Sequence, residues 1–160
     1  MALTKLEYAE RDRARRRSVQ RAVAAAVACE LCPGITAEHG LAVMTGARPG
    51  KRMWRGTPAL RDAARELLDQ DGRRERILEW VDAFNRDHGH GPAWRQLFKA
   101  PGLWAEETPM VIQQCALAVL TLEGRLDGMK TPYSMRPRTA EGGPIAARQR
   151  PADARLSVNA

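Results

Sequence analysis

The 160-residue sequence predicts a mainly α-helical fold with one small β-hairpin. Several segments repeat apolar residues at helical spacing. Residues that start helices precede these segments, and Gly or Pro-Gly follows them. Only the stretch after residue 124 has the short, turn-flanked pattern of a hairpin. Because aromatic residues make up 5% of the chain, the expected core is mostly aliphatic and of modest size.

Residues 1–56 are expected to form an N-terminal region of helix and connector. Good helix formers run without Gly or Pro from about Thr4 to Leu31, and Pro33-Gly34 ends this first helix. The Gly- and Pro-rich connector that follows holds one short helix, with Thr36 as its N-cap. Arg and Ala dominate the first helix, which also carries a narrow apolar stripe suited to packing against another helix.

Residues 57–138 are expected to form the folded body. Thr57-Pro58 is an N-cap followed by proline in the first turn, and opens a helix that runs to about Gln70. Asp71-Gly72 separates it from a helix whose apolar stripe has i, i+3, i+4, i+7 spacing. That stripe consists of Ile77, Trp80, Val81 and Phe84.

The second half of the body alternates turns with shorter elements. Residues 88–92, His-Gly-His-Gly-Pro, predict a turn before a short helix over 93–99. Thr108-Pro109 opens a helix that ends at Gly124, and residues 125–138 then provide the two strands of the hairpin. Residues 139–160 lack any periodicity and are expected to be a disordered tail.

Residues 77–84 are followed by the pattern Gly89-x-Gly91-Pro92-x-Trp94-x-x-Leu97, and then by Leu117, Leu120, Gly124 and Leu126. Through these residues, the segment from 73 to 138 resembles the winged helix-turn-helix DNA-binding domain of LexA-type repressors. The resemblance covers less than half of the chain. It implies a winged-helix core with a β-hairpin wing, preceded by the N-terminal helices. The resemblance is architectural and says nothing about self-cleavage, since a protease domain would not fit here.

This resemblance implies that double-stranded DNA is the partner. The third helix of the domain would present its polar arc to base edges, where glutamine pairs with adenine, and the wing would meet phosphates or the minor groove. The DNA-binding candidates are therefore Gln113, Gln114, Thr121, Arg125, Lys130, Arg136 and Arg138. A bacterial transcriptional regulator or an accessory protein of a mobile element would fit this pattern.

Charge and composition favour the same class of protein. The net charge is +7 and the isoelectric point is about 10.0, which favours a polyanionic partner. The excess of basic residues lies in residues 1–21 and 125–160. No segment predicts a membrane span or an export signal, so we expect a cytoplasmic, nucleoid-associated protein. No nucleophile with a base and no distinctive carboxylate pair is evident, so we expect no enzymatic activity.

Two alternative functions remain open at this stage. One is a winged-helix protein-interaction module that docks into a larger complex, as a homodimer or with another protein. The other is a metal- or thiol-sensing protein that uses Cys29-x-x-Cys32, a spacing that zinc favours, with His39 as a further weak candidate. A second ligand pair is not evident, because His88 and His90 read as turn residues and Cys115 as a buried core residue. We therefore expect plain thiols and no bound cofactor, with zinc as the weaker alternative.

Overall fold

The computed structural model describes residues 3–45, 56–129, 131–139 and 142–144. Within them, six helices precede a small antiparallel sheet, so the prediction of a mainly helical chain with a small β-sheet is confirmed. The helices are α1 (Lys5–Ala28), α2 (Ala37–Met44), α3 (Pro58–Asp69), α4 (Arg73–His88), α5 (Trp94–Phe98) and α6 (Met110–Leu122). The strands are β1 (Leu126–Asp127), β2 (Arg136–Thr139) and β3 (Gly142–Pro144).

Threonine caps define the starts of two of these helices as the sequence predicts. The hydroxyls of Thr36 and Thr57 each accept a hydrogen bond from a backbone N–H three residues on. Thr108 does not cap α6: its hydroxyl donates to the carbonyl of Ala105, and Pro109 occupies the N-cap position. At the other end of the chain, residues 142–144 form β3 rather than a disordered segment, and 145–160 lie outside the described residues.

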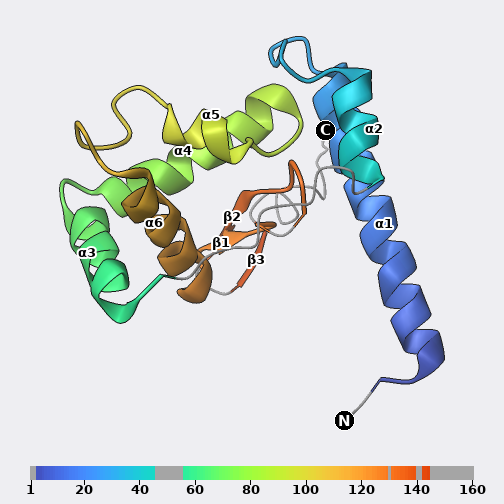
Figure 1. Cartoon of the computed structure of the whole chain (residues 1–160), viewed down its shortest axis with the longest axis horizontal. Helices are drawn as coiled ribbons and strands as arrows, with labels where there is room; N and C mark the ends of the chain where they lie inside the picture. The colour runs from blue at the N-terminus through green and yellow to red at the C-terminus, as the bar shows by residue number, and fades with distance from the viewer. Residues whose placement is uncertain (1–2, 46–55, 130, 140–141, 145–160) are drawn as a thin grey trace.

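Helices α1 and α2 pack on each other beside the rest of the molecule (Figure 1). Val23 and Ala26 of α1 are buried against α2. Gly40 of α2 permits the close approach, since a Cβ at this position would lie 2.8 Å from Val27 and 3.0 Å from Val23. None of the described helices has the length and apolar content needed to cross a membrane.

The main core is built around α6. Each residue from Cys115 to Leu120 has no exposed surface, and six consecutive residues cover more than a full helical turn of about 3.6 residues. Helix α3 packs most extensively on α6, and α4, α5 and the first hairpin strands close the other sides. The core cluster consists of Ala64, Leu68, Ile77, Leu78, Val81, Leu97, Ala100, Leu103, Cys115, Ala116, Leu117, Val119, Leu120, Leu126 and Met135.

The hairpin presses closely on the turn that follows α4. Strand β2 lies between β1 and β3, and both neighbours are antiparallel to it. A Cβ on Gly91 would lie 2.5 Å from backbone atoms of Met135, and the N–H of Gly91 donates to the carbonyl of Tyr133 at 2.7 Å. Only glycine allows this approach, which fixes the position of the neighbouring residue, His90.

Candidate metal centre

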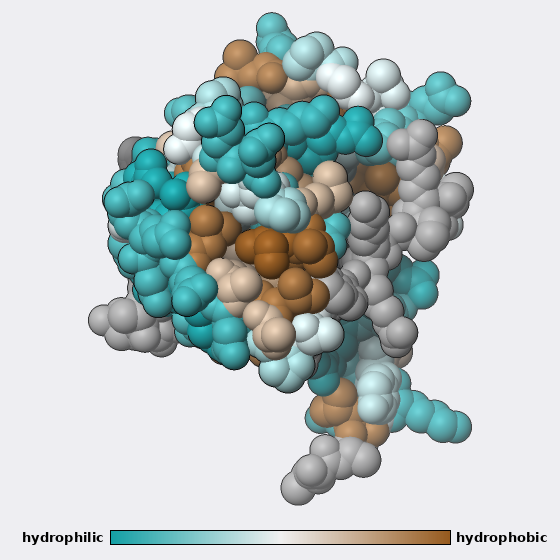
Figure 2. Space-filling view, turned by 60° about the vertical axis from the view of Figure 1, so that its left-hand side comes forward, coloured by the Kyte–Doolittle hydropathy of each residue, from teal (hydrophilic) through white to brown (hydrophobic). Residues whose placement is uncertain are grey.

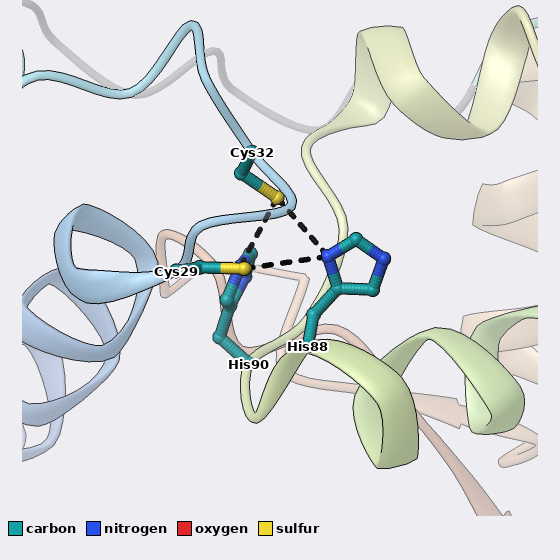
Figure 3. Close-up of side chains that lie close together, drawn as sticks. All are labelled: Cys29, Cys32, His88 and His90. Carbon is teal, nitrogen blue, oxygen red and sulfur yellow. Dashed lines mark hydrogen bonds between the residues drawn. The ribbon is translucent and has the colours of Figure 1, made fainter.

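A CxxC segment at the end of α1 supplies two sulfur atoms. Cys29 is the C-cap residue of α1, and the N–H of Cys32 bonds back to the carbonyl of Cys29. A further turn follows, in which the N–H of Ile35 bonds to the carbonyl of Cys32. This tight loop brings both side chains to the same side of the chain (Figure 3).

The turn after α4 supplies two imidazoles. His88 is the last residue of α4, and Gly89, with a φ of 74°, reverses the chain before His90. The ring of His88 stacks on Phe84 with centroids 3.8 Å apart, and the ring of His90 meets the same phenyl ring edge-on at 5.5 Å. Phe84 therefore holds both rings in fixed orientations beside the sulfur atoms.

The four side chains converge closely enough to hold a single metal ion. One ligand atom from each of Cys29, Cys32, His88 and His90 lies within 4.8 Å of the others. Nδ1 of His88 is 3.5 Å from Sγ of Cys29 and 3.2 Å from Sγ of Cys32, and Nε2 of His90 is 3.4 Å from Sγ of Cys32 (Figure 3). Zinc–sulfur and zinc–nitrogen bonds of about 2.3 and 2.0–2.1 Å, arranged tetrahedrally, place sulfur and nitrogen about 3.6 Å apart. The observed separations are close to this value.

Hydrogen bonds and burial prepare His90 to act as a ligand. Its Nδ1 lies 2.7 Å from the carbonyl oxygen of Gly91, which can only accept, so Nδ1 carries a proton and Nε2 keeps its lone pair toward Cys32. Burial lowers the pKa of His90, outweighing the hydrogen bond to Gly91, and favours the neutral imidazole that binds metals. Such a backbone partner on the distal nitrogen is usual for metal-ligating histidines.

The sulfur of Cys32 lies in an apolar and partly hydrogen-bonded environment. Burial raises the pKa of its thiol, while a hydrogen bond from Nε2 of Gln96, 3.5 Å away, acts in the opposite direction. The same sulfur faces both histidine nitrogens, and a thiol has one proton to donate. Two thiols have two protons for the three close sulfur–nitrogen contacts of the cluster, whereas a metal ion would bind both sulfurs and both nitrogens directly.

The cluster also joins two parts of the molecule. Helices α1 and α2 pack mainly on each other, whereas α3 to α6 and the hairpin share the main core. The Cys–His cluster links these two parts, and Nε2 of His39 on α2 adds a second link, 2.7 Å from the hydroxyl of Tyr133. A metal at this cluster would therefore act at the junction.

The sequence predicts half of this ligand set. The Cys29–Cys32 pair does belong to a cluster that could bind a metal ion such as zinc. His39 lies outside the cluster, and the missing pair is His88 and His90, which the sequence interpretation treated as turn residues. The His-Gly-His pattern was the available signal, because a helix end followed by glycine can direct two nearby imidazoles to one point.

The residues expected to read bases lie on or beside the buried helix α6. Gln113 is buried and its amide donates to the carbonyl of Phe98, which corrects the expectation that it faces outward. Gln114 is half-buried, and the hydroxyl of half-buried Thr121 donates to the carbonyl of Leu117 within the same helix. Burial from Cys115 to Leu120 leaves little of α6 open to a partner.

The described wing residues are partly exposed and engaged with carboxylates. Arg125 bonds to Glu75 at 3.0 Å. Arg136 and Arg138 lie 3.8 and 3.5 Å from the carboxylate of Asp127. Lys130 lies outside the described residues. A phosphate would therefore compete with internal ion pairs for the three arginines.

The fold and the site together define a mainly helical protein with a Cys2His2 cluster that could bind a metal ion such as zinc. No protein-family model, curated protein or solved structure matches the chain. Its function therefore has to be inferred from its own residues.

Proposed function

We propose that the protein binds one zinc ion through Cys29, Cys32, His88 and His90, and that the ion has a structural role. The observation that carries this proposal is the convergence of two sulfur and two nitrogen atoms within 4.8 Å. The contributing segments lie 56 positions apart, as measured between Cys32 and His88. The ion would fasten the α1–α2 pair to the core of α3 to α6.

The chemistry of the ligands favours zinc in a structural site. Two thiolates and two imidazoles form a common tetrahedral zinc set, and a CxxC pair is a frequent half of it. Structural zinc sites use four protein ligands, whereas catalytic sites keep one position for water or substrate. Four side chains here would fill the coordination sphere. Three of the ligands come from residues next to helix ends, where the backbone fixes their positions.

Metal analysis tests this proposal directly. The protein would be produced with zinc in the medium, purified under reducing conditions, and measured by inductively coupled plasma mass spectrometry. We expect one zinc per chain, and a melting temperature that falls on chelation and recovers when zinc is restored. Substoichiometric zinc that cannot be raised by added metal, with a melting temperature insensitive to chelation, would contradict the proposal.

A second candidate function is DNA binding by a protein without enzymatic activity. It is supported by the net charge of +7 and by the order helix, short helix, helix and hairpin in α4, α5, α6 and β1–β2. That order is the one expected for a winged helix. A regulator or mobile-element accessory protein would use such a domain on double-stranded DNA, and a protein-interaction module is the alternative use of the same fold.

The burial of α6 limits how such a domain would contact DNA. To contact DNA bases, the middle of α6 would need an exposed surface, but these residues are buried in the core. The contacts would instead come from cations on other elements. A gel-shift assay with genomic fragments at two salt concentrations tests the proposal, since phosphate contacts weaken as salt rises. Absence of a shift at low salt would count against DNA binding.

A further inference from the structure

The N-terminal arm, defined here as residues 4–21 of the cap and first turns of α1, extends away from the rest of the protein. All residues from Thr4 to Arg17 are exposed, partial burial begins at Ser18, and the first fully buried residue is Val23. Figure 1 shows the arm leaving the body, and Figure 2 shows its tip as a projection at the lower edge of the surface. A helix without packing partners along this length is available to a binding partner.

The second half of the arm is strongly basic on all sides. Residues 11–21 contain six arginines and one acidic residue, Asp12. Successive residues of a helix are about 100° apart, which distributes these arginines around the whole circumference. They are Arg11, Arg13, Arg15, Arg16, Arg17 and Arg21.

Most of these arginines are free of internal ion pairs. Within the part of the chain that the structure describes, Arg16 pairs with Asp12 at 2.6 Å, and the other five have no ion pair. The body differs, because Arg74 and Arg125 bond to carboxylates of other elements. The uncompensated positive charge of the folded part is therefore concentrated on the arm.

The composition of the arm distinguishes between kinds of partner. A helix that lies on a membrane needs an apolar face, and a coiled-coil helix needs an apolar seam. Leu6, Tyr8 and Val19 are the only large apolar residues of the arm, and residues 9–18 between them contain alanine as their only apolar residue type, so the arm has no continuous apolar face or seam. The major groove of DNA admits an α-helix and presents phosphates on both of its walls. A helix with arginines on every side matches that environment.

We propose that the N-terminal arm lies in the major groove of double-stranded DNA, with its arginines bonded to phosphates on both walls. This inference rests on the proposed DNA binding and assigns its principal contact to α1 rather than to α6 or the hairpin. The arm is continuous with Cys29 at the end of α1. The metal cluster would therefore determine the direction in which the arm leaves the body.

Two quadruple variants of the 160-residue protein, produced with zinc in the medium, test the arm. The first replaces Arg11, Arg13, Arg15 and Arg17 by Ala. The second, a control, replaces four exposed arginines of the body by Ala and changes the net charge equally: Arg65, Arg76, Arg86 and Arg95. Because alanine is the best helix former, the arm is expected to stay helical, and circular dichroism checks this.

Affinity for a fluorescein-labelled 24-base-pair DNA duplex would be measured by fluorescence anisotropy across a series of salt concentrations. We expect the arm variant to lose about tenfold or more in affinity at 0.1 M salt. The slope of log affinity against log salt should become shallower by up to about 3.6, from four contacts of about 0.9 each. The control variant should stay within about threefold of the unchanged protein, since its arginines lie outside the proposed contact.

Each other outcome has a distinct meaning. Unchanged binding by the arm variant, or equal losses in both variants, overturns the proposal that the arm contacts DNA, while DNA binding by the protein stands. Absence of duplex binding by the unchanged protein overturns both. Equal affinity for single-stranded DNA of the same length overturns the placement in a groove. Zinc content, measured on the same samples, is independent of all these results and separately tests the metal proposal.

Discussion

Sγ of Cys32 lies 3.2 Å from Nδ1 of His88, 56 positions along the chain. Closing a flexible loop of that length costs about 3.6 kcal/mol in chain entropy plus a constant. A neutral hydrogen bond returns about 1 kcal/mol net. Zinc binding by small structural sites contributes apparent free energies of about 10–16 kcal/mol. The proposed zinc ion would therefore contribute far more to holding these two segments together than one thiol–imidazole hydrogen bond does.

The three histidines of the chain provide a matched test of the ligand set. We expect His88→Ala and His90→Ala each to reduce bound zinc well below one per chain, because three ligands remain. We expect His39→Ala to keep one zinc, since His39 bonds to Tyr133 and lies outside the cluster. Mass spectrometry of the intact protein under native conditions measures the bound metal. Equal zinc loss in all three variants would indicate general unfolding rather than loss of a ligand.

The thiols of the proposed metal site should differ in reactivity from the thiol in the core. Cys115 has no exposed surface, and burial raises the pKa of its thiol above its ordinary value, which disfavours the reactive thiolate. In the zinc-loaded protein we expect all three cysteines to resist iodoacetamide. Chelation should expose Cys29 and Cys32 to alkylation while Cys115 reacts only after denaturation. Peptide mapping identifies the modified residues, and rapid alkylation of the cysteine pair before chelation would contradict a bound metal.

The sequence predicts much of the helical framework because its signals are local. Thr36 and Thr57 cap helices as expected, and the apolar stripe from Ile77 to Phe84 packs into the core. The metal cluster depends instead on two turns distant in sequence. Nothing local to His88 and His90 shows that Cys29 and Cys32 approach them, and so the ligand set was predicted only in part.

The exposure of α6 was predicted wrongly for a related reason. Its polar residues Gln113 and Thr121 resemble an outward face, but both satisfy their hydrogen bonds within the protein. Helix α3, expected before the winged-helix segment, packs along α6 and contributes to its burial. A helical wheel assumes one buried side, and it cannot show a central helix that is covered on all sides.

Zinc binding should release protons at neutral pH. A metal-bound cysteine is a thiolate, and burial raises the pKa of the Cys32 thiol above its ordinary alkaline value, so this thiol is protonated before metal binds. The lowered pKa of His90 leaves that ring neutral, and it contributes no proton. We expect at least one proton per zinc, and an apparent affinity that falls as the pH falls. Calorimetry in buffers of different ionisation enthalpy counts the protons, and a count of zero would refute this description.

Two glycines of the hairpin region allow the energetic cost of backbone strain to be distinguished from that of a steric clash. Gly124 and Gly128 have φ values of 71° and 78°. A Cβ on Gly124 would contact nothing within 4 Å, whereas one on Gly128 would lie 1.7 Å from the carbonyl oxygen of Ser134. We expect Gly124→Ala to cost about 1–2 kcal/mol of unfolding free energy, and Gly128→Ala to cost more than about 4 kcal/mol. Urea denaturation of both variants measures the difference, and equal losses would show that the hairpin can shift without penalty.

The boundary of the independently folding unit depends on α3. The winged-helix resemblance covers residues 73–138 and leaves α3 out, but Ala64, Leu67 and Leu68 of α3 are buried, and α3 packs extensively on α6. Removing α3 would expose apolar surface of α6 that the remaining elements do not cover, in a fragment already near the lower size limit for a stable domain. We therefore expect a fragment of residues 57–139 to fold and one of 72–139 to remain disordered. Dispersed amide resonances in the NMR spectrum of the longer fragment, and collapsed ones in that of the shorter, would support this boundary. A well-dispersed spectrum for residues 72–139 would show that α3 is dispensable for the core.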